Sequence, residues 1–201
     1  MYWGTPDISV QFCEDKYVVS EYIAEYYNTL TAAAYIIIGC LFFNTRFKNI
    51  SVLVMLMGLG TAILHGTLRY YGQWLDEVAM LLLSFFLIKY LREREKKETK
   101  SYFCGLIVTL YFIFNKRFHL FVLLFFAMQC YIYKLANKRK AKLNRTKKYI
   151  VNIYTTLLLL SMFWWMLDQY FCNYIKSYQL HALWHVGTAL SLGLGLLSLI
   201  I

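Results

Sequence analysis

Charged residues are scarce in this sequence. Asp, Glu, Lys and Arg make up 16% of its 201 residues, whereas hydrophobic residues make up 60% and aromatic residues 19%. Proline occurs only once, as Pro6. Because soluble globular domains contain about 25% charged residues, this composition argues against a soluble protein. It predicts an all-α, polytopic membrane protein.

The amino-terminal segment 1–25 lacks the pattern of a signal peptide, since it has no basic start followed by an apolar core. It holds five carboxylates and a single lysine, Lys16. The sequence also lacks internal repeats, low-complexity tracts and any soluble domain. We therefore expect one transmembrane domain over 1–201, with 1–25 outside the membrane and 26–201 forming a helix bundle.

Seven apolar stretches follow the acidic segment, and most are close to the roughly 20 residues that a helix needs to cross about 30 Å of hydrocarbon. They span 26–43, 51–68, 74–91, 102–114, 118–133, 149–170 and 179–201. The fourth and fifth stretches are short and could also form one interrupted helix.

The distribution of basic residues favours seven separate helices. With seven, the loops after the first, third and fifth spans hold two, six and eight basic residues, together 16 of the 21 in the chain. Because basic loops remain cytoplasmic, the amino terminus is predicted to be lumenal or outside and the carboxyl terminus cytoplasmic. The net charge of +10 is then an orientation signal, and we expect no nucleic-acid partner.

Two histidines at the start of the seventh span, His181 and His185, have the i, i+4 spacing that directs both rings to one side of a helix. His65, at the end of the second span, adds a third nitrogen. Three such ligands leave a fourth zinc position for water, as in catalytic sites. Alternatively, the pair could be interfacial side chains that water and lipid headgroups satisfy. We interpret the fourth histidine, His119, as interfacial.

In this topology the other ionisable candidates lie near the same membrane face as the histidines. Ionisable groups at membrane depth are costly and suggest a functional site. The candidates are Glu14 and Glu25 before the first span, Asp76 at the start of the third, and Asp168 at the end of the sixth.

Three separated blocks of the sequence resemble a known family. They are YWGTPDISVQFCEDKYVVSEYIAEYYNT, GLGTAILHGTLRYYGQWLDEVAM, and WWMLDQYFC followed by QLHALWH. In order and spacing they resemble the alkaline ceramidases, seven-helix membrane hydrolases related to the progestin and adiponectin receptors. The resemblance implies an enzyme that cleaves the linear amide bond of a membrane lipid, ceramide or a similar sphingolipid. The products are a sphingoid base and a fatty acid.

The resemblance also implies roles for individual residues. Zinc is expected on His65, His181 and His185, with Asp76 as the acid–base group beside it. Thr61 stands where the family usually has serine, a hydroxyl that helps to stabilise the oxyanion. Two alternatives stay open: Thr61 could bond only to its own helix turn, and Asp76 could only orient a histidine.

Four further residues near these blocks receive structural roles. Glu77 is expected to face the membrane interface or to cap a helix. Asp168 is expected to bond the amino-terminal segment or a neighbouring helix. We interpret Trp164 and Trp165 as lipid or packing contacts.

Members of the family bind calcium near the zinc, and the resemblance places that site in the amino-terminal segment. Glu14, Glu25 and the carbonyl of Phe12 match calcium ligands, whereas Gln11 replaces an aspartate and Lys16 an asparagine. One possibility is calcium on Gln11, Phe12, Glu14 and Glu25, with Lys16 turned outward. The other is that the Lys16 ammonium replaces the ion, so that activity needs no calcium. A third possibility is that the segment is only a solvated acidic tail.

The five cysteines are distributed unevenly. Only Cys13 and Cys172 fall on the outer side of the predicted topology, so we expect a disulfide between them in an oxidising lumen. Cys40, Cys104 and Cys130 are expected to be free.

The sequence thus favours a zinc amide hydrolase, integral to the endoplasmic reticulum or Golgi membrane, with no obligate protein partner. Two other functions stay open. One is a related membrane hydrolase with a different lipid substrate. The other is a non-catalytic seven-helix receptor or assembly factor that keeps a structural zinc.

Overall fold

The computed structural model describes residues 2–100, 102–113, 117–140 and 143–200. Over these residues the chain forms nine α-helices, one 3-10 helix and no β-strand, which confirms the predicted all-α class. The elements are α1 (Tyr26–Thr31), α2 (Ala33–Phe42), α3 (Lys48–Thr67), α4 (Tyr70–Glu93), α5 (Tyr102–Ile113), α6 (Phe118–Lys140), α7 (Arg145–Tyr170), α8 (Cys172–Ile175), η1 (Lys176–Tyr178) and α9 (Leu180–Ile200).

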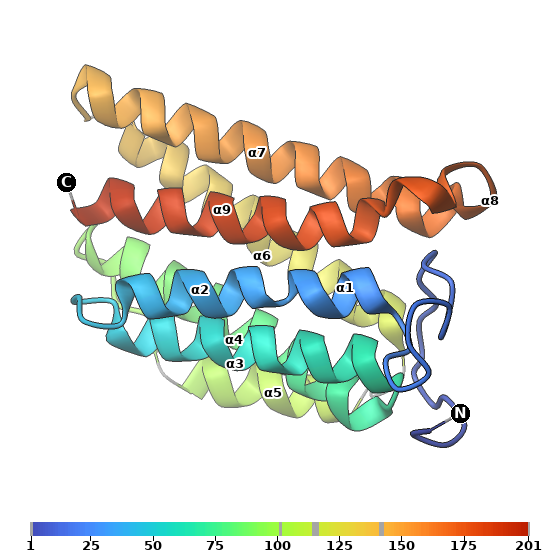
Figure 1. The fold of residues 1–201 in the computed structure, drawn as a ribbon. Coiled ribbons are helices and arrows are strands. Elements are labelled where there is room, and N and C mark those ends of the chain that lie inside the picture. The colour runs from blue at the N-terminus through green and yellow to red at the C-terminus, as the bar shows by residue number, and fades with distance from the viewer. Residues whose placement is uncertain (1, 101, 114–116, 141–142, 201) are drawn as a thin grey trace.

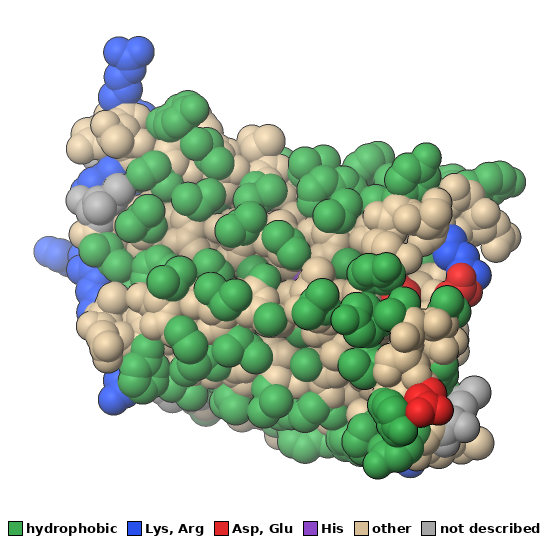
Figure 2. All heavy atoms as spheres, viewed as in Figure 1, with side chains coloured by type: hydrophobic (Ala, Val, Ile, Leu, Met, Phe, Trp, Pro, Cys, Tyr) green, Lys and Arg blue, Asp and Glu red, His purple; other side chains and the backbone are tan. Residues whose placement is uncertain are grey.

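The longer helices lie roughly side by side along one direction (Figure 1). Within the part of the chain that the structure describes, four helices are long and apolar enough to cross a membrane: α3, α6, α7 and α9. Hydrophobic side chains cover the visible flank of the bundle, while basic side chains gather at one end and acidic side chains at the other (Figure 2). This surface fits a protein that lies within a bilayer.

The first predicted span is divided into two helices. Ala32 separates α1 from α2 but keeps helical dihedrals, with φ −57° and ψ −27°, so the two run on in nearly one line (Figure 1). The hydroxyl of Thr31 donates to the carbonyl of Tyr27 at 2.8 Å. The same kind of bond occurs inside the unbroken helix α3, from the Thr61 hydroxyl to the carbonyl of Met57, so α1 and α2 are best described as one span with a local interruption at Ala32.

Four helices, α3, α4, α6 and α7, are longer than the apolar stretches that predicted them, and α4 and α6 show the largest extensions. α4 begins at Tyr70, four residues before the predicted start, and α6 continues to Lys140, seven residues past the predicted end. The last turn of α6 is basic, and positive charge there is favourable beside the negative end of the helix dipole. The expected end of the fourth span and the start of the next turn, 114–116, lie outside the described residues.

Two glycines allow α3 and α4 to pack closely. A Cβ atom on Gly60 of α3 would lie 2.6 Å from the backbone nitrogen of Asp76. A Cβ atom on Gly72 of α4 would lie 2.6 Å from the backbone nitrogen of Leu64. Because real Cβ atoms do not approach other atoms so closely, only glycine fits at these two positions. The close approach brings the start of α4 against the end of α3.

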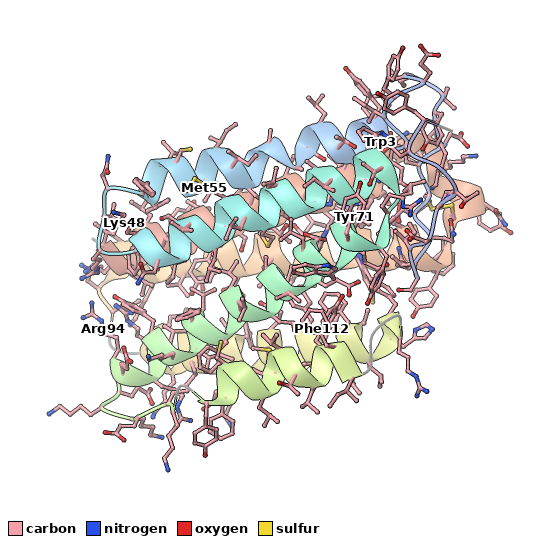
Figure 3. All side chains as sticks on the ribbon, turned by 90° about the horizontal axis from the view of Figure 1, so that it is seen from below. Trp3, Lys48, Met55, Tyr71, Arg94 and Phe112 are labelled. Carbon is pink, nitrogen blue, oxygen red and sulfur yellow. A yellow bond between two sulfur atoms is a disulfide. The ribbon has the colours of Figure 1, made fainter. Side chains whose placement is uncertain are left out.

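The amino-terminal segment packs across one end of the bundle (Figure 1). Its backbone bonds to the end of α3 through Ala24 N to Gly66 O and Glu25 N to His65 O, both at 3.0 Å. In a view from below, Trp3 and Tyr71 lie at this end, whereas Lys48 and Arg94 lie at the opposite end (Figure 3). The segment therefore covers the end of the bundle where His65 lies.

Candidate metal centre and active site

Three histidines from two helices meet inside the bundle. His65 comes from the last turn of α3, and His181 and His185 come from the first two turns of α9. One nitrogen of each ring lies within 4.8 Å of the others, and all three side chains are buried. The structure thus brings together the three residues that the sequence singled out, in a group that could hold a metal ion.

The Nδ1 atoms of the three histidines face oxygen atoms on other elements. His65 Nδ1 lies 2.5 Å from Glu25 Oε2, and His185 Nδ1 lies 3.0 Å from the Thr31 hydroxyl. His181 Nδ1 is buried without a hydrogen-bond partner among the described residues, 3.7 Å from Asp168 Oδ2. Histidines that bind a metal typically place their second ring nitrogen against such oxygens. The Nε2 atoms are then left as the donors to a metal.

Thr61 and Asp76 lie beside this group, on α3 and α4. The Thr61 hydroxyl lies 2.6 Å from Asp76 Oδ1 and 2.8 Å from the carbonyl of Met57 on its own helix. The hydroxyl therefore has a partner outside its own helix turn. In the described part of the chain, the carboxylates that face histidines are Glu25 and Asp168, and Asp76 forms no hydrogen bond to a histidine.

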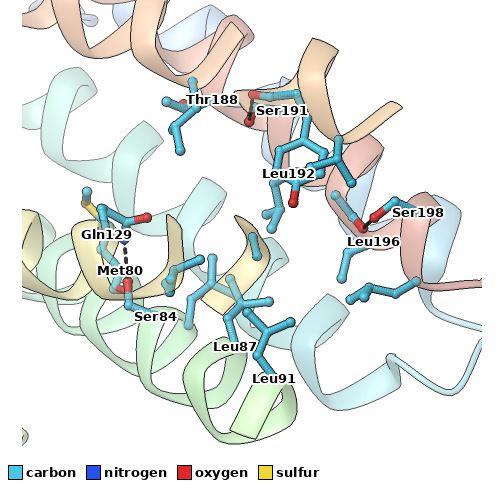
Figure 4. Close-up of a pocket in the computed structure, with 18 of the residues that line it drawn as sticks. Met80, Ser84, Leu87, Leu91, Gln129, Thr188, Ser191, Leu192, Leu196 and Ser198 are labelled. Atoms are coloured by element: carbon cyan, nitrogen blue, oxygen red, sulfur yellow. Dashed lines mark hydrogen bonds between the residues drawn. The ribbon is translucent and has the colours of Figure 1, made fainter. Parts of the chain in front are cut away.

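A small cavity joins these groups, and a larger one lies next to it. The small cavity is lined by the three histidines, Thr61 and Asp76, together with aromatic side chains such as Phe121 and Trp165. The larger cavity has a volume of about 150 Å³ and a mostly apolar lining (Figure 4). Residues common to both linings are Tyr35, Met57, Met80, Phe125 and Trp184. An apolar chamber thus adjoins the polar site.

Glu77 does not face the membrane interface or cap a helix, so this expectation is wrong. Its side chain is buried, with 4% of its surface exposed. It accepts hydrogen bonds from Gln73 Nε2 at 2.8 Å and from the Tyr111 hydroxyl at 2.7 Å. Gln73 in turn donates to the Ser9 hydroxyl at 2.6 Å. The i, i+4 spacing of Gln73 and Glu77 was the one sequence signal of this network.

The Lys16 ammonium points inward, into the acidic part of the amino-terminal segment. Its Nζ donates to the carbonyls of Phe12 at 2.5 Å and Glu14 at 2.7 Å, and lies 2.6 Å from Glu25 Oε1. The Gln11 side chain is exposed. Because the ammonium takes oxygens that a calcium ion would need, these residues do not fit calcium in this arrangement.

The two carboxylates of this segment differ in environment. The Glu14 carboxylate accepts from the backbone nitrogens of Tyr27 at 2.7 Å and Asn28 at 2.8 Å, at the start of α1. Burial raises the pKa of Glu14 above its ordinary value in spite of these bonds. Burial also acts to raise the pKa of Glu25, but contacts with His65 and Lys16 outweigh it, so the Glu25 pKa lies below its ordinary value.

A disulfide between Cys13 and Cys172 joins the amino-terminal segment to α8, with the two Cα atoms 5.2 Å apart. The carbonyl of Asp168, at the end of α7, contacts the Cys13 sulfur at 2.9 Å. Asp168 thus contacts the segment through its carbonyl and faces His181 of α9 through its carboxylate. The other three cysteines, Cys40, Cys104 and Cys130, are free.

Comparison with known proteins identifies the family of this chain. A family model described as Ceramidase matches residues 4–201. The chain belongs to the ceramidase family. It is 28% identical to an alkaline ceramidase of Arabidopsis thaliana over 208 residues, which covers 92% of this chain and 80% of that protein. It is 27% identical to alkaline ceramidase 1 of Mus musculus over 214 residues, covering 94% of this chain and 78% of the relative.

A third relative matches a shorter part of the chain at higher sequence identity. Over 87 residues, 39% of this chain, it is 37% identical to alkaline ceramidase YPC1 of Saccharomyces cerevisiae, covering 28% of that protein. The resemblance drawn from the three sequence blocks is therefore confirmed.

Proposed function

We propose that this protein is a zinc-dependent hydrolase that cleaves the amide bond of ceramide, or of a closely similar sphingolipid, within the membrane. The products are a sphingoid base and a fatty acid. The observation that carries the proposal is the meeting of three buried histidines with Asp76 and Thr61 in the lining of one cavity. The names of the relatives, all alkaline ceramidases, support the substrate class.

The proposed metal is zinc, on His65, His181 and His185. Three neutral imidazoles leave one position open, the arrangement of catalytic zinc sites. When bound, zinc acts as a Lewis acid that polarises a carbonyl group and makes water more acidic. Glu25 and Thr31 orient two of the rings: a Glu25 carboxylate oxygen contacts Nδ1 of His65, and the Thr31 hydroxyl contacts Nδ1 of His185.

Asp76 is the proposed general base and acid. Its Oδ1 faces Thr61, which leaves Oδ2 to take a proton from the attacking water. The water oxygen bonds to the amide carbon, the carbon–nitrogen bond breaks, and Asp76 returns the proton to the leaving nitrogen. The Thr61 hydroxyl holds the carboxylate in place and can turn to donate to the oxygen on which negative charge develops.

The larger cavity is the proposed site for a hydrocarbon chain of the lipid. Leucines on α4 and α9, including Leu87 and Leu192, line it (Figure 4). Burial of apolar surface stabilises binding by roughly 25 cal/mol per Å², so a long chain can contribute most of the binding energy. The polar head of the lipid would then lie beside Thr61 and Asp76.

The proposed topology has seven membrane helices, with α1 and α2 together forming the first, and α8 and η1 forming a short connection before α9. The amino terminus is lumenal or outside. Support comes from the gathering of basic side chains at the end of the bundle opposite the amino-terminal segment (Figure 2). We place the protein in the endoplasmic reticulum or Golgi membrane.

The test combines metal analysis of the purified protein with product detection from labelled ceramides. We expect about one zinc per chain and release of a fatty acid. His181→Ala and His185→Ala should lose both zinc and activity, whereas His119→Ala, which changes an exposed histidine outside the site, should keep both. Zinc without turnover of any lipid would favour a receptor or assembly factor. Turnover confined to other lipid classes would favour a related hydrolase.

A further inference from the structure

The Glu25 carboxylate is fully buried and lies between two nitrogen groups. Its Oε1 lies 2.6 Å from Lys16 Nζ, and its Oε2 lies 2.5 Å from His65 Nδ1. The Asn28 side-chain amide donates to Oε2 at 3.1 Å. An ionised carboxylate in such a place is stable only when it is paired. Lys16 supplies the formal positive charge of this cluster.

The surroundings of Lys16 match an ammonium group. Its Nζ donates to the carbonyls of Phe12 and Glu14 and forms an ion pair with the carboxylate of Glu25. The Glu14 carboxylate is engaged elsewhere, since its two oxygens accept from the backbone nitrogens of Tyr27 and Asn28 in the first turn of α1. One ammonium balances the single carboxylate charge at this point, whereas calcium takes six to eight oxygens.

The backbone next to Lys16 is held in an unusual conformation. Tyr17 has φ 60°, in the left-handed region that a tyrosine rarely adopts. Its backbone nitrogen donates to the carbonyl of Ala24 at 2.7 Å, which closes the segment into a loop. A residue in this region is retained only where surrounding contacts compensate for its cost. The contacts of the Lys16 ammonium are part of that compensation.

We propose that Lys16 is a positioning residue. Its ammonium ties the amino-terminal segment over the histidines and, through Glu25, fixes the His65 ring in the orientation that binds metal. The site therefore needs no calcium. The inference rests on the proposed function only in taking zinc as the metal, and its test needs no turnover, because zinc affinity can be measured without substrate.

The experiment compares four forms of the full chain in detergent and in calcium-depleted buffer. They are the wild type, Lys16→Gln, Lys16→Asp and Lys176→Gln. Lys176 is the matched control: it forms an ion pair with Asp15 at the same end of the bundle, but both side chains are about half exposed. Zinc affinity is measured by competition with a metal indicator, and bound calcium by metal analysis.

We expect Lys16→Gln to bind zinc about 10- to 100-fold more weakly than the wild type, the usual effect of losing a group that orients a metal ligand. Lys176→Gln should bind zinc like the wild type. The wild type should contain no bound calcium. Lys16→Asp should bind zinc weakly without calcium and recover with added calcium but not with magnesium, because its carboxylate replaces the ammonium with an oxygen ligand.

A double-mutant cycle shows whether Lys16 acts through Glu25. Glu25→Gln alone should weaken zinc binding, and adding Lys16→Gln to it should cause little further loss, because the two changes break one chain of contacts. Fully additive losses in zinc affinity would mean that Lys16 does not act through Glu25 and would overturn the proposal.

Two other results would also overturn it. One is zinc affinity in Lys16→Gln equal to that of Lys176→Gln. The other is a wild type that holds calcium and loses zinc affinity when calcium is removed. If Lys16→Gln does not fold, the zinc affinity of Lys16→Asp purified in calcium provides the test. A zinc affinity close to that of the wild type supports the proposal, and a weak zinc affinity overturns it. A wild type that binds zinc but cleaves no ceramide rejects the proposed function and leaves this test intact.

Discussion

The Thr61 hydroxyl lies 2.6 Å from Asp76 Oδ1, across the contact between α3 and α4. The chain reverses between them at Leu68, which ends α3 in the left-handed conformation with φ 55°. Gly60, next to Thr61, lies against the backbone of Asp76. The pair thus depends on how closely two helices pack, and this dependence can be tested.

Asp76→Asn is expected to keep zinc and to lower kcat by about 10²- to 10⁴-fold, the usual contribution of a general acid–base group. Asparagine has nearly the same size but cannot take a proton from water. Ceramide turnover and metal content of the purified variant measure the two effects. Glu93→Gln, which changes an exposed carboxylate at the end of α4, is the control. Full activity in Asp76→Asn would remove Asp76 from the mechanism.

Thr61→Ser should have a mild effect on kcat, because serine keeps the hydroxyl that faces Asp76. Thr61→Ala should lower kcat by about 10²-fold, as the loss of a donor to a developing oxyanion does. Steady-state kinetics of both variants, beside the exposed Thr109→Ala on α5, give the comparison. Equal activity in all forms would show that Thr61 serves only its own helix.

Gly60→Ala should destabilise the protein by about 1–3 kcal/mol, because the added methyl group must push α4 away from α3. Activity should fall as well, since Asp76 moves with α4. Gly105→Ala is the control, because a Cβ atom on Gly105 meets nothing within 4 Å and alanine favours a helix over glycine. Thermal unfolding in detergent measures both. Equal stability of the two variants would contradict the close packing.

Tyr111→Phe should lower stability by about 1–3 kcal/mol, because it leaves one oxygen of the buried Glu77 without its donor. Tyr102→Phe, at an exposed position of the same helix, should have little effect. Thermal unfolding of the two variants separates a specific bond from a general effect of removing a hydroxyl. A shift of the same size in both would argue against the bond to Glu77.

Loss of the bridge between Cys13 and Cys172 should lower the unfolding free energy by about 2–5 kcal/mol, because a bridge between residues 159 apart in sequence restricts the unfolded chain. Thermal unfolding of Cys13→Ser measures this loss, with Cys40→Ser as the control for a free cysteine. Peptide mapping without reductant should recover Cys13 and Cys172 joined. Recovery of both as free thiols would rule the bridge out.

Several features of this protein were determined by local sequence alone. Apolar stretches of near-membrane length predicted the helices, and the i, i+4 spacing of His181 and His185 set two rings on one face of α9, because helical geometry fixes that relation. The three family blocks added His65, Thr61 and Asp76. These signals need no knowledge of which helices are neighbours.

Other features were decided only by the tertiary structure. Glu77 lies in an apolar stretch next to Asp76, and nothing in its local sequence shows that Tyr111 of α5 stands opposite it. The local sequence also left open which way the Lys16 side chain points, because a flexible side chain can reach either solvent or the protein interior from the same backbone position. Glu25 decides it, because a buried carboxylate attracts a cation wherever the fold places one in reach. Such contacts join residues distant in the chain, so only the packing of the helices and the amino-terminal segment determines them.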